Sequence, residues 1–245
     1  SSMYAIELTE LTKKFKNRTA VDSLSFQINE GEIFSLLGQN GAGKTTTIRM
    51  LSCLCSPTSG DAKVMGRSIL SNEEDVKHLI GVSPQETAVA RRLSVQENLE
   101  LMASVYGAAR AESRRRADEM MAAFGLSDRS GDRADKLSGG MQRRLSIAMA
   151  LISRPKVLFL DEPTLGLDVR ARRDLWRHIT AHRQEMTIIL TTHYLEEAES
   201  LSDRIGVMNG GRLVALGSAD DIVRQTGAAS FEDAFLALTD EEVTA

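Results

Sequence analysis

The sequence predicts an α/β fold with a mainly parallel sheet, and two observations carry this prediction. The stretches 157–160 and 187–190 are almost continuously apolar, as expected of strands that helices cover on both faces. A third apolar stretch, 33–37, leads into a glycine-rich turn and then into a helical pattern, which is how an α/β unit opens. With 245 residues the chain needs no disulfide bonds, and Cys53 and Cys55 fit neither a disulfide framework nor a four-ligand zinc site.

The N-terminal part of the chain indicates a separate antiparallel β subdomain. Ile6 and Leu8 alternate with polar residues, and the apolar residues of 21–28 do the same, as in a half-exposed sheet. After the glycine-rich turn, a helix is predicted over residues 45–54.

The middle of the chain shows helical periodicity and no strand pattern. Ser94 and Glu97 form a capping-box pattern that opens a helix. The apolar residues expected on one face of this helix are Val95, Leu99, Met102, Val105 and Tyr106. A second helix is predicted over 114–124, and a third begins after Ser138. We therefore expect a helical subdomain, inserted at about residues 90–153.

The C-terminal part returns to short strands, which are predicted over 204–208 and 212–216. Two helices with serine caps follow, opened by Ser218 with Asp221 and by Ser230 with Asp233. These elements form a short β/α tail over about 204–245. The whole chain, residues 1–245, is expected to be one domain.

Charge and hydropathy limit the classes of partner. A formal net charge of −4 provides no general attraction to nucleic acid, so no nucleic-acid partner is expected. No stretch approaches the ~20 apolar residues that span a bilayer, and the N-terminus lacks the basic-then-apolar pattern of a signal peptide. We expect a soluble intracellular protein, and any membrane-spanning segments would belong to other chains.

Arg114, Arg115 and Arg116, flanked by acidic residues, indicate a solvated helix face.

The glycine-rich turn matches the P-loop pattern in full. Its residues are Gly38, Gln39, Asn40, Gly41, Ala42, Gly43, Lys44 and Thr45, and Thr46 follows. Glycines at these spacings let backbone N–H groups close around phosphate oxygens, and the positive end of the next helix faces the same anion. Lys44 is expected to reach the β- and γ-phosphates, and the Thr45 hydroxyl to hold Mg²⁺.

Asp161 and Glu162 form an acidic pair at the end of the apolar stretch 157–160. In open α/β sheets, ligands bind at the carboxyl ends of the strands. Alone, such a pair fits a strand-end turn or a helix cap equally well, but the P-loop upstream favours catalysis. Asp161 would then belong to the Mg²⁺ shell, and Glu162 would polarise the water that attacks the γ-phosphate.

A third motif consists of Leu137, Ser138, Gly139, Gly140, Met141 and Gln142. Ser138 can cap the helix that follows, and the two glycines allow close approach to an anion. Alone, the motif is compatible with an ordinary helix N-terminus. Because one P-loop already serves the phosphates, a second anion-binding helix start favours contact with the nucleotide of a partner.

In their order and spacing these motifs resemble those of the ATP-binding subunits of ATP-binding cassette (ABC) transporters, over nearly the whole chain. Drug-resistance-type exporter cassettes are favoured because the segments 210–217 and 231–238 are similar to their tails. The resemblance implies a P-loop NTPase with a RecA-like core, which hydrolyses ATP with Mg²⁺ and powers separate transmembrane permease subunits. It places the chain in the cytoplasm, peripheral at the inner face of the cell membrane. It also implies a head-to-tail dimer with a second copy or a related cassette, in which residues 137–142 act in trans as the signature motif.

Four further residues gain a role only through this resemblance. Gln85 is similar to the Q-loop glutamine that touches Mg²⁺, where the helical subdomain meets the membrane partner. His193 is similar to the switch histidine that contacts the γ-phosphate, and both residues are counted as catalytic with Glu162. Asp168 resembles the D-loop residue at the dimer interface. Phe15 takes the place of the aromatic residue that stacks on adenine.

The sequence departs from the family pattern at three positions. Gln39 stands where proline is common, Phe15 replaces the more frequent tyrosine, and Val169 follows Asp168 where proline is usual. None of these changes removes a ligand of the phosphate, the metal or the water.

Two other functions remain open at the level of sequence. One is a soluble single-cassette ABC ATPase in an assembly or repair process, which the absence of a second cassette and of a long coiled-coil insertion disfavours. The other is a P-loop kinase with a small-molecule acceptor. The kinase leaves the Leu-Ser-Gly-Gly segment 137–140 and His193 without a role.

Overall fold

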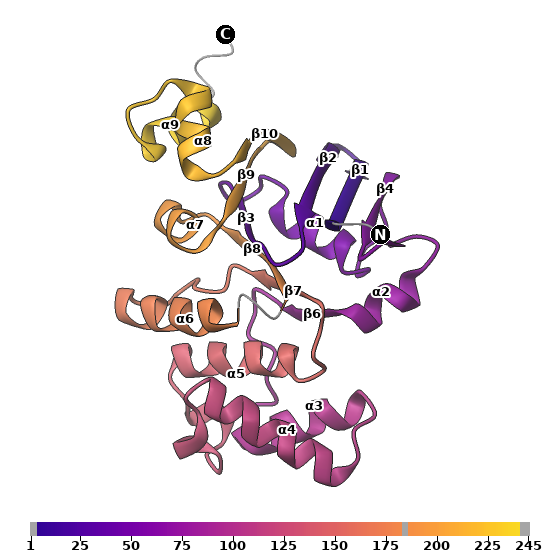
Figure 1. The fold of residues 1–245 in the computed structure, drawn as a ribbon, viewed down its shortest axis with the longest axis vertical. Coiled ribbons are helices and arrows are strands. Elements are labelled where there is room, and N and C mark those ends of the chain that lie inside the picture. The colour runs from indigo at the N-terminus through magenta and orange to yellow at the C-terminus, as the bar shows by residue number, and fades with distance from the viewer. Residues whose placement is uncertain (1–3, 183–185, 241–245) are drawn as a thin grey trace.

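The computed structural model describes residues 4–182 and 186–240 and contains two sheets, the larger through its middle and the smaller at the upper right in Figure 1. The larger sheet has the strand order β10-β9-β3-β8-β7-β6. Its strands are β3 (Ile33–Leu37), β6 (Ile80–Ser83), β7 (Val157–Asp161), β8 (Thr187–Thr192), β9 (Arg204–Asn209) and β10 (Arg212–Gly217). Neighbours from β9 to β6 are parallel and β10 is antiparallel to β9, so the predicted α/β class with a mainly parallel sheet is confirmed.

The smaller sheet has the order β2-β1-β4-β5 and is antiparallel throughout. Its strands are β1 (Tyr4–Phe15), β2 (Arg18–Asn29), β4 (Ser59–Val64) and β5 (Arg67–Ser68). The predicted N-terminal antiparallel unit is therefore confirmed. The sequence shows no clear strand pattern at β4 or β5, because β4 has only two buried residues and β5 is two residues long.

Helices cover both faces of the larger sheet, which explains its apolar strands. In β7, Leu158 and Leu160 pack in the core under α3 to α6, whereas Val157 and Phe159 pack on the opposite face with α1 and the smaller sheet. The helices are α1 (Lys44–Leu51), α2 (Glu73–Leu79), α3 (Val95–Val105), α4 (Arg110–Ala123), α5 (Gly139–Leu151), α6 (Val169–Ala181), α7 (Leu195–Leu201), α8 (Ala219–Thr226) and α9 (Phe231–Thr239), with 3₁₀ turns at Ser127–Arg129 and Ala134–Lys136. Among the described residues, no helix combines the length and the apolar character needed to cross a bilayer.

Three helices, α3 to α5, lie between β6 and β7 in the chain and form the lower end of the molecule in Figure 1. The capping box of Ser94 with Glu97 is present at the start of α3, and Ser138 caps α5. Ser218 and Ser230 likewise cap α8 and α9, as predicted. Residues 1–3, on which the expectation of no signal peptide partly depends, and residues 241–245, the end of the predicted tail, lie outside the described residues.

Two predicted details are wrong. The helix predicted over 45–54 ends at Leu51, because the backbone turns at Cys53, whose φ is +63°. On α3, Val105 and Tyr106 are exposed although we expected them on the buried face. This helix ends at Val105 and the chain turns away at Gly107, so its last turn has no covering layer.

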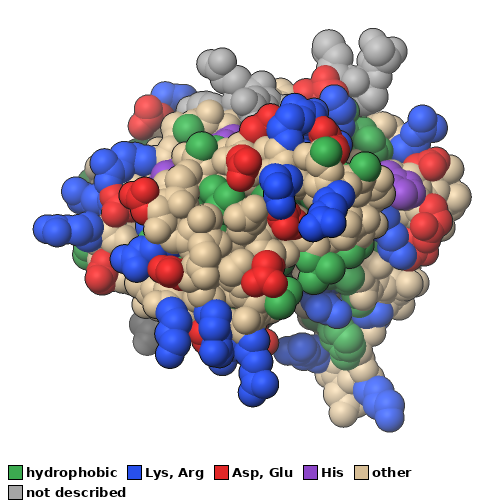
Figure 2. All heavy atoms as spheres, turned by 90° about the horizontal axis from the view of Figure 1, so that it is seen from below, with side chains coloured by type: hydrophobic (Ala, Val, Ile, Leu, Met, Phe, Trp, Pro, Cys, Tyr) green, Lys and Arg blue, Asp and Glu red, His purple; other side chains and the backbone are tan. Residues whose placement is uncertain are grey.

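The end of the molecule formed by α3 and α4 carries mixed charges rather than a field of one sign. Seen from this end, Lys and Arg side chains are interspersed with Asp and Glu (Figure 2). On α4, Arg115 and Arg116 both pair with Glu112, at 2.6 and 2.9 Å, and Arg114 lies 3.8 Å from Glu100 of α3. This is the solvated helix face with paired charges that the sequence predicts.

We expect Ser94→Ala to lower the free energy of unfolding by about 1 kcal/mol, because it removes the side-chain cap of α3. In the parent chain the Ser94 hydroxyl accepts from the Glu97 N–H at 3.0 Å, and the Glu97 carboxylate accepts from the Ser94 N–H at 3.0 Å. Urea unfolding followed by circular dichroism measures the change. Ser71→Ala, in an exposed loop, is the control and should have little effect; equal effects for the two variants would contradict the capping role.

Candidate nucleotide-binding site

The P-loop, residues 38–43, joins β3 to α1 and packs closely on two other strands. A Cβ on Gly43, whose φ is +100°, would lie 2.5 Å from the carbonyl oxygen of Ala20 in β2. A Cβ on Gly38 would lie 2.6 Å from the carbonyl oxygen of Met208 in β9. Only glycine allows these approaches, so the shape of the phosphate cradle depends on both sheets.

Lys44, the first residue of α1, has its ammonium group buried behind this loop. Its Nζ donates to the carbonyl oxygens of Gly38 and Thr192 and forms an ion pair with Oε1 of Glu162 at 3.0 Å. Both side chains of the pair are 5% exposed. A buried charge without a partner is unfavourable, so each side chain of the pair compensates the charge of the other. The pair thereby connects the P-loop to the end of β7.

Glu162 is held at both carboxylate oxygens. Oε1 faces Lys44, and Oε2 lies 3.0 Å from Nδ1 of His193, which follows β8. The backbone N–H of Glu162 donates to the carbonyl oxygen and the hydroxyl of Thr191, at 3.2 and 3.0 Å. Its φ of +48° is uncommon for a residue other than glycine, and such backbone strain is found at functional sites. Lys44 and His193 therefore fix the carboxylate, and Thr191 fixes the backbone that carries it.

Oxygen donors suited to Mg²⁺ lie beside this carboxylate. The Thr45 hydroxyl donates to Oδ1 of Asp161 at 3.2 Å, and the side chain of Gln85 lines the same cavity. Among the described residues no group of three or more His, Cys, Asp or Glu forms a metal site. A hydroxyl, a carboxylate and an amide fit Mg²⁺ nevertheless, because proteins hold this ion through few carboxylates and leave other positions to water and substrate phosphates.

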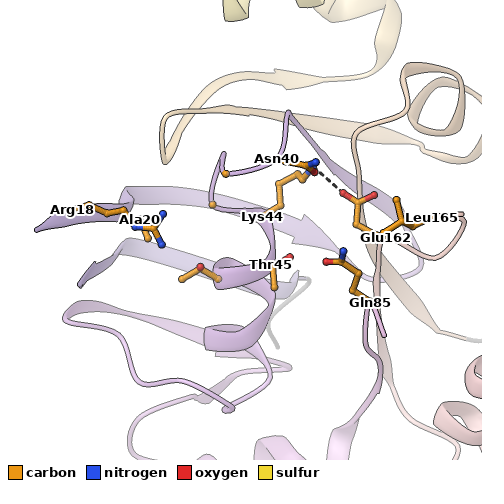
Figure 3. A pocket seen from close by; sticks show the side chains of 11 residues that line it. Arg18, Ala20, Asn40, Lys44, Thr45, Gln85, Glu162 and Leu165 are labelled. Atoms are coloured by element: carbon orange, nitrogen blue, oxygen red, sulfur yellow. Dashed lines mark ion pairs between the residues drawn. The ribbon is translucent and has the colours of Figure 1, made fainter. Parts of the chain in front are cut away.

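One cavity brings together eight of the predicted site residues (Figure 3). It is lined by Arg18, Ala20, Asn40, Gly41, Gly43, Lys44, Thr45, Thr46, Gln85, Glu162 and Leu165. Within it Lys44 points at Glu162, and Thr45 lies on the side facing Gln85. No sequence motif pointed to Arg18, Ala20 or Leu165. Pairing of β2 with β1 brings Arg18 opposite Phe15, and this register is the only signal that could have found it.

Phe15 ends β1 and is 45% exposed beside the cavity wall. The guanidinium of Arg18 lies 5.7 Å from the ring centroid, and the Lys13 ammonium lies 5.4 Å from it. Phe15 itself does not line the cavity of the described chain. An exposed ring face beside two cations is suited to stacking on a nucleobase whose phosphates extend into the cavity.

The segment 137–142 lies apart from the cavity, at the N-terminal end of α5. The Ser138 hydroxyl accepts from the Met141 N–H at 3.2 Å. A Cβ on Gly140 would lie 3.2 Å from the side chain of Ala171, so α5 packs closely on the first turn of α6. Asp168 caps that turn, and its Oδ1 accepts from the Ala171 N–H at 2.8 Å. The predicted signature and D-loop residues therefore lie together, away from the P-loop of their own chain.

Arg143 connects α5 to the segment that carries Gln85. Its guanidinium donates to the carbonyl oxygens of Pro84 at 2.9 Å and of Gln85 at 2.7 Å. Burial lowers the pKa of this guanidinium, and the nearby Asp161 opposes the shift. Arginine remains charged all the same, so its two backbone contacts fix the loop firmly. The sequence gives no hint of this residue.

A second carboxyl group, Glu197 in α7, is fully buried beside the site. Its Oε2 accepts from the Thr164 hydroxyl at 2.6 Å and from Nε1 of Trp176 at 2.7 Å. Burial raises the pKa of Glu197, hydrogen bonds from Thr164, Trp176 and Thr192 oppose the shift, and the charge of Glu162 adds to it. Glu197 thus ties α6 and the loop after Glu162 to α7.

The fold and the phosphate cradle define the class of protein: a P-loop NTPase. Residues 21–165 match the family described as ABC transporter. A daunorubicin resistance ATP-binding protein of Streptomyces coeruleorubidus is 40% identical over 91% of this chain and 71% of its own length. A linearmycin resistance ATP-binding protein of Bacillus subtilis is 38% identical over 91% of this chain and 72% of its own. A dimeric ATP-binding cassette, solved in a post-hydrolysis state with ADP and phosphate, superposes with a TM-score of 0.78 at 26% identity, covering 87% of this chain and 98% of its own.

The chain therefore belongs to the ABC transporter family. It is an ATP-binding subunit that hydrolyses ATP, with the Mg²⁺ dependence general to these ATPases. The similarity to drug-resistance ATP-binding proteins favours a transporter subunit of the exporter kind over a soluble assembly or repair ATPase.

We expect Glu197→Gln to change the pH dependence of stability. Because the pKa of Glu197 in the folded chain lies above its ordinary value of 4.5, the folded chain keeps this proton where the unfolded chain loses it. Its contribution to stability is therefore present below pH 4.5 and decreases as the pH rises through the folded pKa.

The variant lacks this decrease, so its free energy of unfolding relative to the parent should be higher at pH 8 than at pH 5. Urea unfolding at both pH values measures the difference. Glu196→Gln alters the exposed neighbour and should show the same difference from the parent at both values. A difference for Glu197→Gln that does not vary with pH would contradict a raised pKa.

Proposed function

We propose that this chain powers export through separate transmembrane permease subunits, at the cytoplasmic face of the cell membrane, by forming a head-to-tail dimer around two ATP molecules. The observation that carries this proposal is the division of the site. The cavity at the P-loop contains Lys44, Thr45, Gln85 and Glu162, whereas the segment 137–142 lies elsewhere on the same chain. A second copy would complete each cavity with the segment that the first copy cannot supply.

ATP binding changes the partner of Lys44. In the structure its ammonium is neutralised by Oε1 of Glu162. A triphosphate in the cradle supplies anionic oxygens to the same ammonium, so the ion pair can open without leaving a bare buried cation. Oε1 of Glu162 is then free to accept a proton from the attacking water, while His193 retains Oε2.

Mg²⁺ would be held by the Thr45 hydroxyl, the Asp161 carboxylate and the Gln85 amide. Its chemistry is to neutralise charge on the phosphate oxygens during transfer. Asp161 is kept in position by Thr191, whose hydroxyl donates to Oδ1. The remaining contribution of the chain is positioning, because phosphoryl transfer requires aligned groups more than covalent chemistry.

The two ends of the nucleotide would contact different copies, adenine this chain and the γ-phosphate the second copy as well. Phe15 offers its exposed ring to adenine, and Arg18 lies between this ring and the cavity. In the dimer, Ser138 with Gly139 and Gly140 of the other copy would approach the γ-phosphate at the N-terminal end of α5. Asp168 would cross the interface next to them, since the two segments are neighbours in the fold.

The cargo class follows from the relatives rather than from the site. Two curated relatives are named for resistance to daunorubicin and to linearmycin. Their names support export of a drug, which the transmembrane subunits would bind.

We expect Glu162→Gln to bind ATP and to stall turnover in a closed dimer. The amide removes the anion that competes for Lys44 but cannot accept the proton of the water. Size-exclusion chromatography with light scattering, with and without ATP, should show a shift from monomer to dimer. Loss of ATP binding in this variant would contradict the role given to Glu162.

The trans contact is tested in the same background. Adding Ser138→Arg should abolish the ATP-dependent dimer, because the side chain blocks the approach of the second copy. Ser138→Ala is the matched control, since it removes the same helix cap without adding bulk. A dimer that forms equally with Ser138→Arg would contradict the shared site.

A further inference from the structure

We infer that Tyr194 and Arg172 are positioning residues, which hold the imidazole of His193 against Glu162 by a stack of three side chains. The inference rests on the proposed function, because it assigns a role through His193. Neither residue lines the cavity of the described chain, and both act only through His193.

The stack is continuous from α6 to the cavity. The rings of His193 and Tyr194 have centroids 4.1 Å apart and an interplanar angle of 38°. On the tyrosine ring lies the guanidinium of Arg172, 4.3 Å from the centroid. The imidazole then meets Oε2 of Glu162 at 3.0 Å.

Among the described residues, the guanidinium of Arg172 has no hydrogen-bond or ion-pair partner that would explain its position. Its Nε is buried and has no hydrogen-bond partner within the described part of the chain. Burying an N–H group without an acceptor is unfavourable, so attraction to the ring has to offset that cost. Its neighbour Arg173, by contrast, is exposed and pairs with Glu196 at 3.6 Å.

His193 needs such support because one hydrogen bond does not fix an imidazole plane. The torsion that turns the ring has a broad, nearly two-fold preference, so the ring can rotate about its single bond to Glu162. Packing against Tyr194 restricts this rotation and keeps Nδ1 directed at Oε2. The other ring nitrogen, on the opposite side of the imidazole, is then left for the γ-phosphate.

The stack also connects His193 to the predicted D-loop. The N–H of Arg172 donates to the carbonyl oxygen of Asp168 at 2.9 Å, in the first turn of α6. A displacement of this turn at a dimer interface therefore moves Arg172, and with it the surface on which Tyr194 and His193 rest.

The test is steady-state ATP hydrolysis by Arg172→Met, Tyr194→Leu and Tyr194→Phe, with Arg173→Met as the matched control on the same helix. Arg172→Met keeps the apolar stem and removes the cation, and Tyr194→Leu removes the ring. Misplacement of a catalytic group by ~1 Å can cost ~100-fold in rate, so we expect kcat to fall about tenfold in both, with KM for ATP nearly unchanged. Tyr194→Phe keeps the ring and should retain most of the parental kcat, and Arg173→Met should match the parent.

A cycle with His193→Ala separates positioning from a general loss of stability. If the stack acts through His193, adding Arg172→Met to His193→Ala should lower kcat no further. Additive losses, or a parental kcat for Arg172→Met, would overturn the inference. Should Tyr194→Leu not fold, the Arg172→Met cycle decides the matter alone.

Measuring Glu162→Gln in the same assay distinguishes a failure of the proposed function from a failure of the stack alone. If Glu162→Gln retains turnover, the proposed function fails. If it stalls while Arg172→Met and Tyr194→Leu turn over like the parent, only the stack is wrong.

Discussion

The ion pair between Lys44 and Glu162 is the interaction on which the rest of the site depends. It joins the start of α1 to the end of β7, and both charges are removed from water. Because either charge would be unfavourable if it were buried alone, Lys44 cannot separate from Glu162 unless another anion replaces the carboxylate. Phosphate is such a replacement. The ion pair therefore already places the Lys44 ammonium for an anionic group, and little reorganisation is needed when the nucleotide binds.

The packing of the P-loop also shows why the two sheets have to lie against each other. Gly43 packs on the carbonyl oxygen of Ala20 from the antiparallel sheet, and Gly38 packs on that of Met208 from the parallel one. The backbone N–H of Gly211, in the turn between β9 and β10, donates to the carbonyl oxygen of Ala42 at 3.0 Å. A loop of a few residues thus takes its shape from segments at both ends of the chain.

The parts of this protein that local chemistry determines could be predicted from the sequence. The apolar stretches around Phe159 and Ile189, the glycine pattern of the P-loop and the serine caps all depend on near neighbours in the chain. Arg18, Arg143 and the Arg172–Tyr194 stack could not be predicted, because each acquires its partner only when distant segments pack. Val105 was misjudged for the same reason, since helical periodicity shows an apolar face but not where its covering ends.

The helix α5 has a mechanical consequence. It begins at Ser138 and bonds through Arg143 to the backbone of Gln85. A helix of 13 residues is a stiff rod about 20 Å long at ~1.5 Å per residue. In the proposed dimer one end of this rod touches the nucleotide of the other copy, and its side bears on the glutamine loop of its own. A displacement at either contact is transmitted through this helix, so the two ATP sites cannot move independently of each other.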